Sequence, residues 1–381
     1  MARKDSKPYR LSWSLSSLAL ALALEGRLEE AEQLIAEAKR ANPAYADAVL
    51  LEANATIQWL AGDFRGAVAS WLESAAWNSG GESCRRGWAA AVAAIAAGEL
   101  GSLAEAHHYL EHAARVYAGR GFYAWSQHVD WATGFMGWRT GEASPIPAFR
   151  RAADRWLAIG SLPNAAFSLL DLAESAALLG QPDAAHEAGQ RLREVSDRIE
   201  RPLYSAVASL GSAWAELSAD RPSAALDLAR KAAAVFAAAR YRAFEARSLE
   251  VVGRALIASD RGAAAESLVA ASAGFDALGA GWRRDRCSAV LSRLGQTGRR
   301  AASNSSAVAL TAREAEVARL GAQGLTARDI GRQLFIGERT VETHLANVYV
   351  KLGLESKREL VLRAVELGLQ SGTEPERRTP R

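Results

Sequence analysis

A turn followed by a helix start that carries a small residue recurs along most of the chain, and this repeat limits the fold more than any other feature. The anchoring alanines are Ala31, Ala67, Ala106, Ala148, Ala185, Ala225 and Ala265, at successive spacings of 36 to 42 residues. Each period is long enough for two helices and two turns, and alanine lets paired helices approach closely. The repeat therefore predicts an all-α superhelix of about seven helical hairpins over residues 11–294, with a concave inner face for binding.

Three helix-start signals follow one another after the repeat has ended. They occupy residues 311–314, 326–329 and 356–359. In each, a Ser or Thr precedes a carboxylate by three residues, so both side chains can satisfy first-turn backbone N–H groups. Gly324 and Gly353 stand where the end of a helix favours a left-handed residue. Residues 335–339 are too few for anything but a tight turn, so this segment predicts a helix-turn-helix.

These C-terminal residues resemble the LuxR-type DNA-binding domain. The likeness rests on Leu310-Thr311-Ala312-Arg313-Glu314, Gly324-Leu325-Thr326, Asp329-Ile330, Thr340-Val341-Glu342-Thr343-His344, Asn347-Val348-Tyr349-Val350-Lys351-Leu352-Gly353 and Glu359-Leu360. It covers about residues 308–370, and we place the domain at 310–370. The resemblance implies a four-helix module that binds operator DNA as a dimer, with its third helix in the major groove. By position, that recognition helix runs from Glu338 to about Val350.

The predicted recognition helix has two distinct faces. An apolar stripe with spacings of three and four should pack on the other helices of the module. Its members are Val341, Leu345, Val348 and Leu352. On the opposite face, Thr343, Ala346 and Asn347 are candidates for reading base edges, the first two through a thymine methyl group.

The other candidates for DNA contact are polar or charged. Thr340 and Lys351 suit phosphate contacts, one as a hydroxyl donor and the other as a flexible point charge. His344 either donates to a phosphate or packs against the first helix of the module, and Glu342 could accept from a cytosine amine. The full predicted set is Thr326, Arg339, Thr340, Glu342, Thr343, His344, Ala346, Asn347 and Lys351.

Charge gives this prediction modest support. Residues 299–381 contain 14 Lys and Arg against 10 Asp and Glu, whereas the whole chain carries a formal net charge of +3. The positive excess therefore lies at the end that would meet phosphates. Glu338 and Glu342 stand on or near the face that would approach this polyanion. They motivate an alternative, a tetratricopeptide-type protein-interaction adaptor whose helix-turn-helix is vestigial or binds protein.

The repeats resemble tetratricopeptide-type repeats, in the lengthened form found in large ATP-dependent LuxR-type regulators. Those regulators carry an ATPase domain with a glycine-rich loop that ends in Gly-Lys-Ser/Thr. No Gly-Lys dipeptide occurs in this sequence, so we expect no nucleotide and no other cofactor. No catalytic constellation is recognisable, and an enzyme is not expected. His107, His108 and His112 share one predicted helix, where a solvated surface is favoured over a metal site.

An aromatic segment near the middle of the array leaves two interpretations open. Trp131, Phe135 and Trp138 fall on one helix face, and Trp125 precedes them. These rings either fill the core of a repeat or line a pocket for a small effector such as a sugar or a drug-like molecule.

The remaining segments complete the predicted organisation. We expect a disordered start at 1–10, a flexible linker at 295–309 and a disordered tail at 371–381. No stretch is apolar enough to span a membrane, which favours a cytoplasmic protein.

Together these features predict a transcriptional regulator that binds double-stranded DNA. Its array would sense a partner protein or a small effector, and RNA polymerase or a regulatory protein would be a further partner. A stripe of Leu360, Ala364 and Leu367 on the last helix suggests a homodimer on DNA.

Overall fold

A computed structural model shows an all-helical protein. It describes residues 7–41, 48–77, 84–119, 123–305, 310, 312–334, 336–352, 354, 356–364 and 369. Within these ranges every regular element is a helix, and none of the helices is long and apolar enough to cross a membrane. The chain divides into two compact units, residues 1–294 and 295–381.

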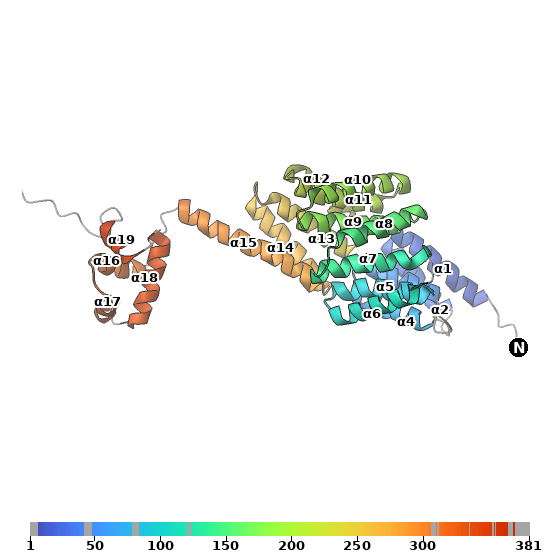
Figure 1. Ribbon diagram of the computed structural model, residues 1–381, viewed down its shortest axis with the longest axis horizontal. Helices are drawn as coiled ribbons and strands as arrows, with labels where there is room; N and C mark the ends of the chain where they lie inside the picture. The colour runs from blue at the N-terminus through green and yellow to red at the C-terminus, as the bar shows by residue number, and fades with distance from the viewer. Residues whose placement is uncertain are drawn as a thin grey trace, which may run out of the picture. The chain divides into compact units, whose positions relative to one another are not determined.

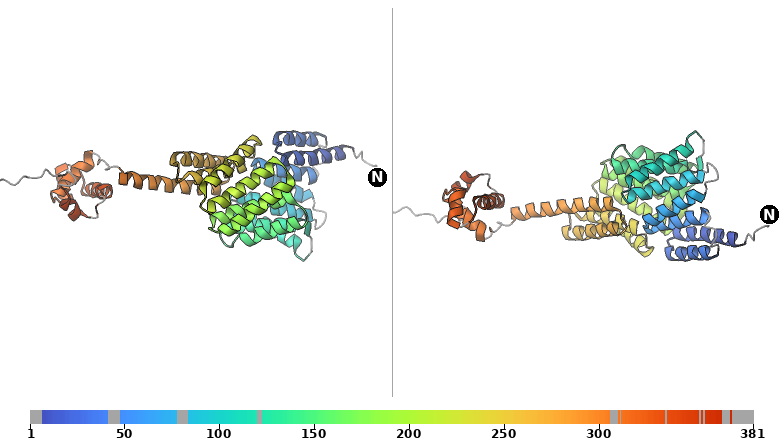
Figure 2. Two further views of the ribbon diagram at one scale, coloured as in Figure 1. Left: turned by 90° about the horizontal axis from the view of Figure 1, so that it is seen from above. Right: turned by 90° about the horizontal axis from the view of Figure 1, so that it is seen from below.

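In the residues that the structure describes, the first unit contains seven helical hairpins and most of one long helix, which continues past residue 294 (Figure 1). The hairpins are α1 (Lys7–Leu24) with α2 (Leu28–Ala41), α3 (Ala48–Ala61) with α4 (Phe64–Trp77), α5 (Cys84–Glu99) with α6 (Leu103–Tyr117), α7 (Tyr123–Thr140) with α8 (Ile146–Ala158), α9 (Leu162–Leu178) with α10 (Pro182–Ile199), α11 (Pro202–Ser218) with α12 (Pro222–Ala238), and α13 (Arg242–Leu256) with α14 (Arg261–Ala277). The long helix is α15 (Gly281–Ser305). Successive pairs lie side by side in Figure 1 and in both views of Figure 2, which confirms the predicted array.

The anchoring alanines lie on the second helix of each hairpin. Ala31, Ala67, Ala106, Ala185 and Ala225 are fully buried, and each is the fourth residue of its helix. The seventh anchor was placed one residue too late, because α14 begins at Arg261 and its fourth residue, Ala264, is the buried one. Asp260 fixes this start, since its side chain accepts from the backbone N–H of Ala263 at 3.0 Å.

The turns inside the first six hairpins use left-handed residues to end the first helix sharply. Gly62 has a φ of +87°, and its N–H donates to the carbonyl of Trp59 at 3.0 Å. The N–H of Asp63 then reaches the carbonyl of Gln58 at 2.8 Å, which completes a Schellman motif. In the sixth hairpin Asp220 takes the same role with a φ of +56°.

The superhelical array closes on itself, because its first and last hairpins are in contact. The hydroxyl of Tyr241 at the start of α13 donates to the carbonyl of Ala23 in α1. Arg240 forms an ion pair with Glu32 of α2 at 3.4 Å. These contacts join the first hairpin to the seventh, because the superhelix returns to its own beginning. The hairpins therefore contact more than their neighbours along the chain.

Two terminal segments differ from their predictions. α1 begins at Lys7, inside the segment 1–10 that was expected to be disordered, and residues 1–6 lie outside the described part of the chain. α15 continues to Ser305, so the predicted linker at 295–309 is helical as far as that residue. Alanine, arginine and glutamine favour helix there, and they offset two glycines that cost about 1 kcal/mol each. Residues 306–309 and the tail at 371–381 lie outside the described residues.

In the described part of the second unit, four helices follow α15 and surround a small core of their own. They are α16 (Ala312–Ala322), α17 (Ala327–Leu334), α18 (Glu338–Leu352) and α19 (Lys357–Leu362). The core consists of Val317, Ala318, Ala322, Ile330, Val341, Leu345, Val348, Leu354, Leu360 and Ala364. This arrangement has the predicted number and order of helices.

Candidate functional site

The helices α17 and α18 form a helix-turn-helix whose start and turn are fixed by local contacts. The hydroxyl of Thr326 accepts from the backbone N–H of Asp329 at 3.2 Å and donates to that residue's carboxylate, as expected of an N-cap. Gly331 is buried within α17, and a Cβ there would lie 2.8 Å from the carbonyl oxygen of Ile336 in the turn that follows. α18 starts after Gly337, whose carbonyl accepts from Thr340 and Val341. Only glycine at position 331 allows this close approach.

The structure divides α18 into the two faces that periodicity predicted. Val341 and Val348 are fully buried in the core of the unit, and Leu345 is 7% exposed. The side chains on the other face are exposed, and they are Arg339, Thr340, Glu342, Thr343, Ala346 and Asn347. His344 lies between the two faces and is partly buried. Thr326 is exposed at the start of α17.

Two of the proposed base readers differ in how freely their polar groups can move. The hydroxyl of Thr343 donates to the carbonyl of Arg339 within α18 at 2.9 Å, which fixes its rotamer. The side-chain amide of Asn347 forms no hydrogen bond with any described residue and is exposed. An amide can donate and accept at once, so Asn347 has the chemistry to pair with an adenine edge.

Lys351 is not a free cation in this structure. Its ammonium forms an ion pair with the carboxylate of Glu314 on α16, and that carboxylate is only 7% exposed. The pair ties the C-terminal half of α18 to the first helix of the unit. Lys351 therefore has a structural partner where the sequence suggested only a phosphate.

Sequence reasoning overlooked two cations on α17. Arg328 and Arg332 are exposed on this helix, and they lie close enough to Asp329 to help lower the pKa of its carboxyl, although the largest cause is its hydrogen bond with Thr326. Because α17 precedes the recognition helix, these guanidinium groups are candidates for phosphate contacts. Their spacing of four residues on a polar helix face was the available signal.

The stripe that suggested a dimer contact belongs to the core of the unit. Leu360 is fully buried and Ala364 is 1% exposed, so neither is available to a second chain. The prediction was wrong because an apolar stripe shows that a face is covered but not what covers it. Leu367 lies outside the described residues, and α19 as described ends at Leu362. Val361 on α19 is 41% exposed.

The four aromatic residues singled out in the array are divided between two environments. Phe135 and Trp138 pack edge to face with Trp282 of α15, at centroid distances of 6.1 and 5.2 Å. Trp125 and Trp131 instead line a cavity of about 460 Å³, which we call the aromatic cavity. Its other large rings are Trp59, Trp71, Trp88, His128 and Phe167. Phe135 and Trp138 therefore fill the core, whereas for Trp125 and Trp131 the role in binding an effector stays a prediction.

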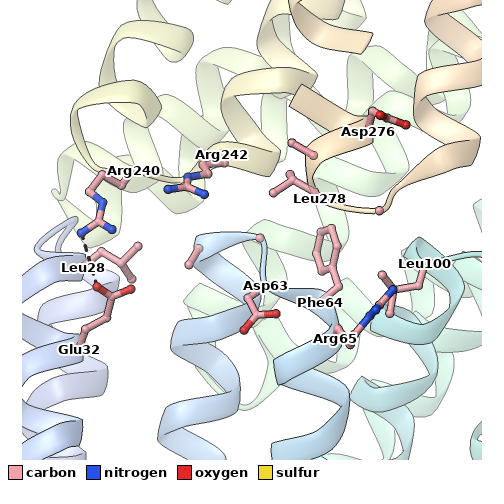
Figure 3. A pocket seen from close by; sticks show the side chains of 14 residues that line it. Leu28, Glu32, Asp63, Phe64, Arg65, Leu100, Arg240, Arg242, Asp276 and Leu278 are labelled. Atoms are coloured by element: carbon pink, nitrogen blue, oxygen red, sulfur yellow. Dashed lines mark hydrogen bonds and ion pairs between the residues drawn. The ribbon is translucent and has the colours of Figure 1, made fainter. Parts of the chain in front are cut away.

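A second cavity, of about 580 Å³, lies where the array closes (Figure 3). Glu32, Asp63, Arg65, Arg240, Arg242 and Asp276 contribute charged groups to its walls. Figure 3 shows Arg240 and Glu32 directed toward each other across this cavity. Acidic and basic groups are balanced and several are already paired, so we assign the second cavity no ligand.

A buried ionic network joins helices that are far apart in the sequence. Glu174 of α9 accepts from Arg247 at 2.7 Å, from Arg283 at 2.7 Å and from Arg286 at 2.6 Å. Burial alone would raise the pKa of Glu174, but the three arginines around it hold that pKa well below its usual range. Asp171, one turn earlier, accepts from Arg247 at 2.8 Å. The network thus fixes α15 to α9 and α13.

No metal site emerges from the histidine-rich helix. The Nδ1 atom of His107 lies 2.8 Å from the carbonyl oxygen of Leu103, so that ring is engaged by its own helix. In the described part of the chain, no three His, Cys, Asp or Glu residues are placed to share a metal ion. The cysteines Cys84 and Cys287 are both free thiols.

The fold and the exposed face of α18 define the second unit as a helix-turn-helix domain of the kind found in bacterial regulators. Residues 308–364 match the family described as bacterial regulatory proteins, luxR family. Spore germination protein GerE of Bacillus subtilis is 39% identical over 59 residues, which cover 16% of this chain and 80% of GerE. Through this unit the chain belongs to the luxR family of bacterial regulatory proteins.

Other relatives share only part of their length with this chain. An HTH-type transcriptional regulator of Mycobacterium tuberculosis is 48% identical over 62 residues, which cover 16% of this chain but only 7% of that protein. For the array, a tetratricopeptide-repeat signal transduction ATPase of Pyrococcus horikoshii aligns with 74% of this chain and 47% of its own. Its TM-score is 0.46 at 13% sequence identity.

Proposed function

We propose that this chain is a sequence-specific DNA-binding transcriptional regulator whose helical array senses a partner protein or a small effector. The observation that carries the proposal is the exposed polar face of α18, in a unit that belongs to the luxR family. Thr343, Ala346 and Asn347 would read bases in the major groove. Arg339, Thr340 and the cap residue Thr326 would contact phosphates.

The array is attached to α15 in a way that suits sensing. Arg283 and Arg286 at the start of α15 are 2% and 16% exposed and are bound to Glu174 of α9. A rearrangement of α9 would therefore alter the contacts of α15, the helix that precedes the DNA-binding unit in the sequence. We propose that the array acts on DNA binding through this helix, with RNA polymerase or a regulatory protein as a further partner.

We also propose that the chain binds DNA as a homodimer, through a contact other than the stripe of Leu360 and Ala364, which is buried. Helix-turn-helix proteins commonly bind two half-sites as dimers, and a two-fold dimer would require a palindromic operator. Sedimentation of the full chain on a duplex with two half-sites tests this directly. A complex with one chain per duplex at saturation would refute the dimer.

Specific observations also keep the adaptor alternative open. Glu338 and Glu342 are exposed at the start of α18, where they would repel a nearby phosphate backbone. In the adaptor alternative, α18 binds a basic protein surface instead of DNA.

Retention of host DNA fragments by the full chain, followed by sequencing at two salt concentrations, separates the two functions. A regulator should enrich one short palindromic motif at both salts, and Asn347→Ala should lose it. Retention without a motif that vanishes at the higher salt would favour the adaptor. Gln323→Ala, an exposed amide at the end of α16, is the matched control and should leave the motif unchanged.

A further inference from the structure

The aromatic cavity lies inside the array and has a size suited to a small organic molecule. At about 460 Å³ it falls within the range of ligand pockets in proteins, which is about 300 to 1,000 Å³. Residues from α1, α3, α4, α5, α7 and α9 line it, so it draws on five of the seven hairpins. Occupancy would therefore affect contacts between hairpins, which are the interfaces that determine the shape of the array.

Several of the rings that line the cavity pack against one another. Trp59 packs edge to face on Trp131 at 5.9 Å and on Phe167 at 5.3 Å. Trp88 stacks on Trp125 at 5.9 Å with an interplanar angle of 30°. Such rings offer faces and edges to a planar aromatic ligand, and aromatic pairs are stabilised beyond the burial of their area.

Three residues that line the cavity carry buried donors without a described partner. The indole N–H groups of Trp71 and Trp88 and the Nε–H of Arg85 are buried and donate to no other described atom. The carboxylate of Glu52 on the same wall is already engaged, because it accepts from Arg85 at 2.7 Å and from Ser74 at 3.3 Å. A buried donor left unpaired is destabilising, so a ligand that supplies acceptors would recover this loss.

We propose that the aromatic cavity binds a planar aromatic molecule that carries carboxylate or carbonyl oxygens. The rings select the flat apolar body, and the donors of Trp71, Trp88 and Arg85 select the oxygens. A cationic aromatic molecule fits less well, because it adds a positive charge beside Arg85 while Glu52 is occupied. The inference rests on the proposed function, since this ligand would be the effector that the array senses.

Calorimetric titration of the full chain with 2-naphthoate tests the ligand class. We expect saturable binding with one site per chain. The matched probe is 2-naphthylmethylammonium, which has the same rings and the opposite charge, and it should bind at least about tenfold more weakly. Equal or tighter binding of the cation would overturn the assigned chemistry, and failure of 2-naphthoate to bind would overturn the site.

Variants at the mouth of the cavity test its location. Ser17 of α1 lines the cavity and is exposed, so Ser17→Trp should block entry without disturbing the fold. Ser14→Trp is the matched control, because Ser14 is exposed on the same helix and does not line the cavity. We expect Ser17→Trp to weaken 2-naphthoate binding by about tenfold or more and Ser14→Trp to leave it unchanged. Unchanged binding in Ser17→Trp would place the ligand elsewhere.

Removal of a single donor tests the role of the N–H groups. Trp88→Phe keeps an aromatic ring and deletes an N–H that has no partner in the free protein, so no hydrogen bond is lost. Its melting temperature should stay near that of the parent while affinity for 2-naphthoate falls about tenfold. Trp214→Phe is the control, since Trp214 also has an unpaired buried N–H but does not line the cavity. Equal affinities in the two variants would refute the role of the Trp88 donor.

Retention of DNA by the same preparations distinguishes failure of this site from failure of the proposed function. A chain that retains its DNA motif but does not bind 2-naphthoate refutes the ligand site alone. A chain that binds 2-naphthoate and retains no motif supports the ligand site and refutes the regulator.

Discussion

Arg283 donates to Glu99 from both Nε and Nη2, at 2.9 and 2.8 Å, although the two residues are 184 positions apart in the sequence. Glu99 ends α5 in the third hairpin, and Arg283 begins the helix that follows the seventh. Trp282 adds a third bond to the same carboxylate at 2.8 Å. The helix that leads to the DNA-binding unit is therefore fixed to the middle of the array as well as to its end.

Loss of Glu174 should be among the most damaging single changes in the array. Glu174→Ala leaves three buried guanidinium groups without their shared acceptor, and breaking a buried pair costs about 3–5 kcal/mol. Thermal unfolding measures the loss, and hydrogen exchange should show α15 less protected. Glu187→Ala removes a surface partner of Arg150 whose side chain is 40% exposed, and it should cost only about 0–1 kcal/mol. Similar losses in both variants would contradict a central role for Glu174.

Stability of the array should fall in mild acid because of His128. Burial among rings lowers the pKa of His128 to about 4 from its ordinary value of 6.5. Between these two values the unfolded chain binds the proton more tightly, so the free energy of unfolding decreases as the pH falls through this window. The shift corresponds to about 3 kcal/mol.

Chemical denaturation from pH 7 to pH 4 measures this dependence on His128. His128→Phe should flatten the profile over that window, whereas His186→Gln, which changes an exposed histidine, should leave it unaltered. A profile that is equally steep in His128→Phe would assign the acid sensitivity to other groups.

Lys351 should contribute more to the stability of the DNA-binding unit than to its affinity. Lys351→Met leaves the carboxylate of Glu314 nearly buried without its cation, which should cost about 1–3 kcal/mol. Combining it with Glu314→Gln should recover part of that loss, because the buried charge is then gone. Thermal unfolding tests both variants. If Lys351 served only as a phosphate contact, the single change would instead lower the salt slope of binding by about one and leave stability intact.

Asn347 should determine base preference at one position of the operator. Replacing its amide by a methyl group removes a bidentate contact of about 1–3 kcal/mol, which corresponds to a loss of preference of about 5- to 150-fold. Competition between operators that differ at single positions measures this change. Asn347→Ala should relax one position only. A uniform loss across all sequences would mean that Asn347 contacts the backbone rather than a base.

Features that depend on local sequence were predictable. The anchoring alanines and the cap at Thr326 act within a few residues of their positions, so spacing alone revealed them. Closure of the array was not predictable, because Ala23 and Glu99, the partners of Tyr241 and Arg283, lie far from them in the sequence and no periodicity marks them. Pairing of Lys351 with Glu314 was missed for the same reason, since a single exposed cation and a distant acid carry no pattern.

The aromatic segment shows where a pattern was correct and its interpretation incomplete. Trp131, Phe135 and Trp138 do share a face of α7 in sequence, yet only Trp131 reaches the aromatic cavity. Phe135 and Trp138 are covered by Trp282 of α15, a helix that helical periodicity alone could not bring to them. Helix faces are readable from sequence, whereas the neighbour of each face is a property of the whole fold.

The meeting of Tyr241 with Ala23 also restricts how this protein can evolve. An open solenoid tolerates the duplication or deletion of a repeat, since each new unit meets the same neighbours as the old one. Here an added hairpin would move Tyr241 away from α1. The loss of a hairpin would leave Tyr241 unable to reach Ala23. Surface side chains can change without affecting this contact, whereas a change in the number of hairpins would break it.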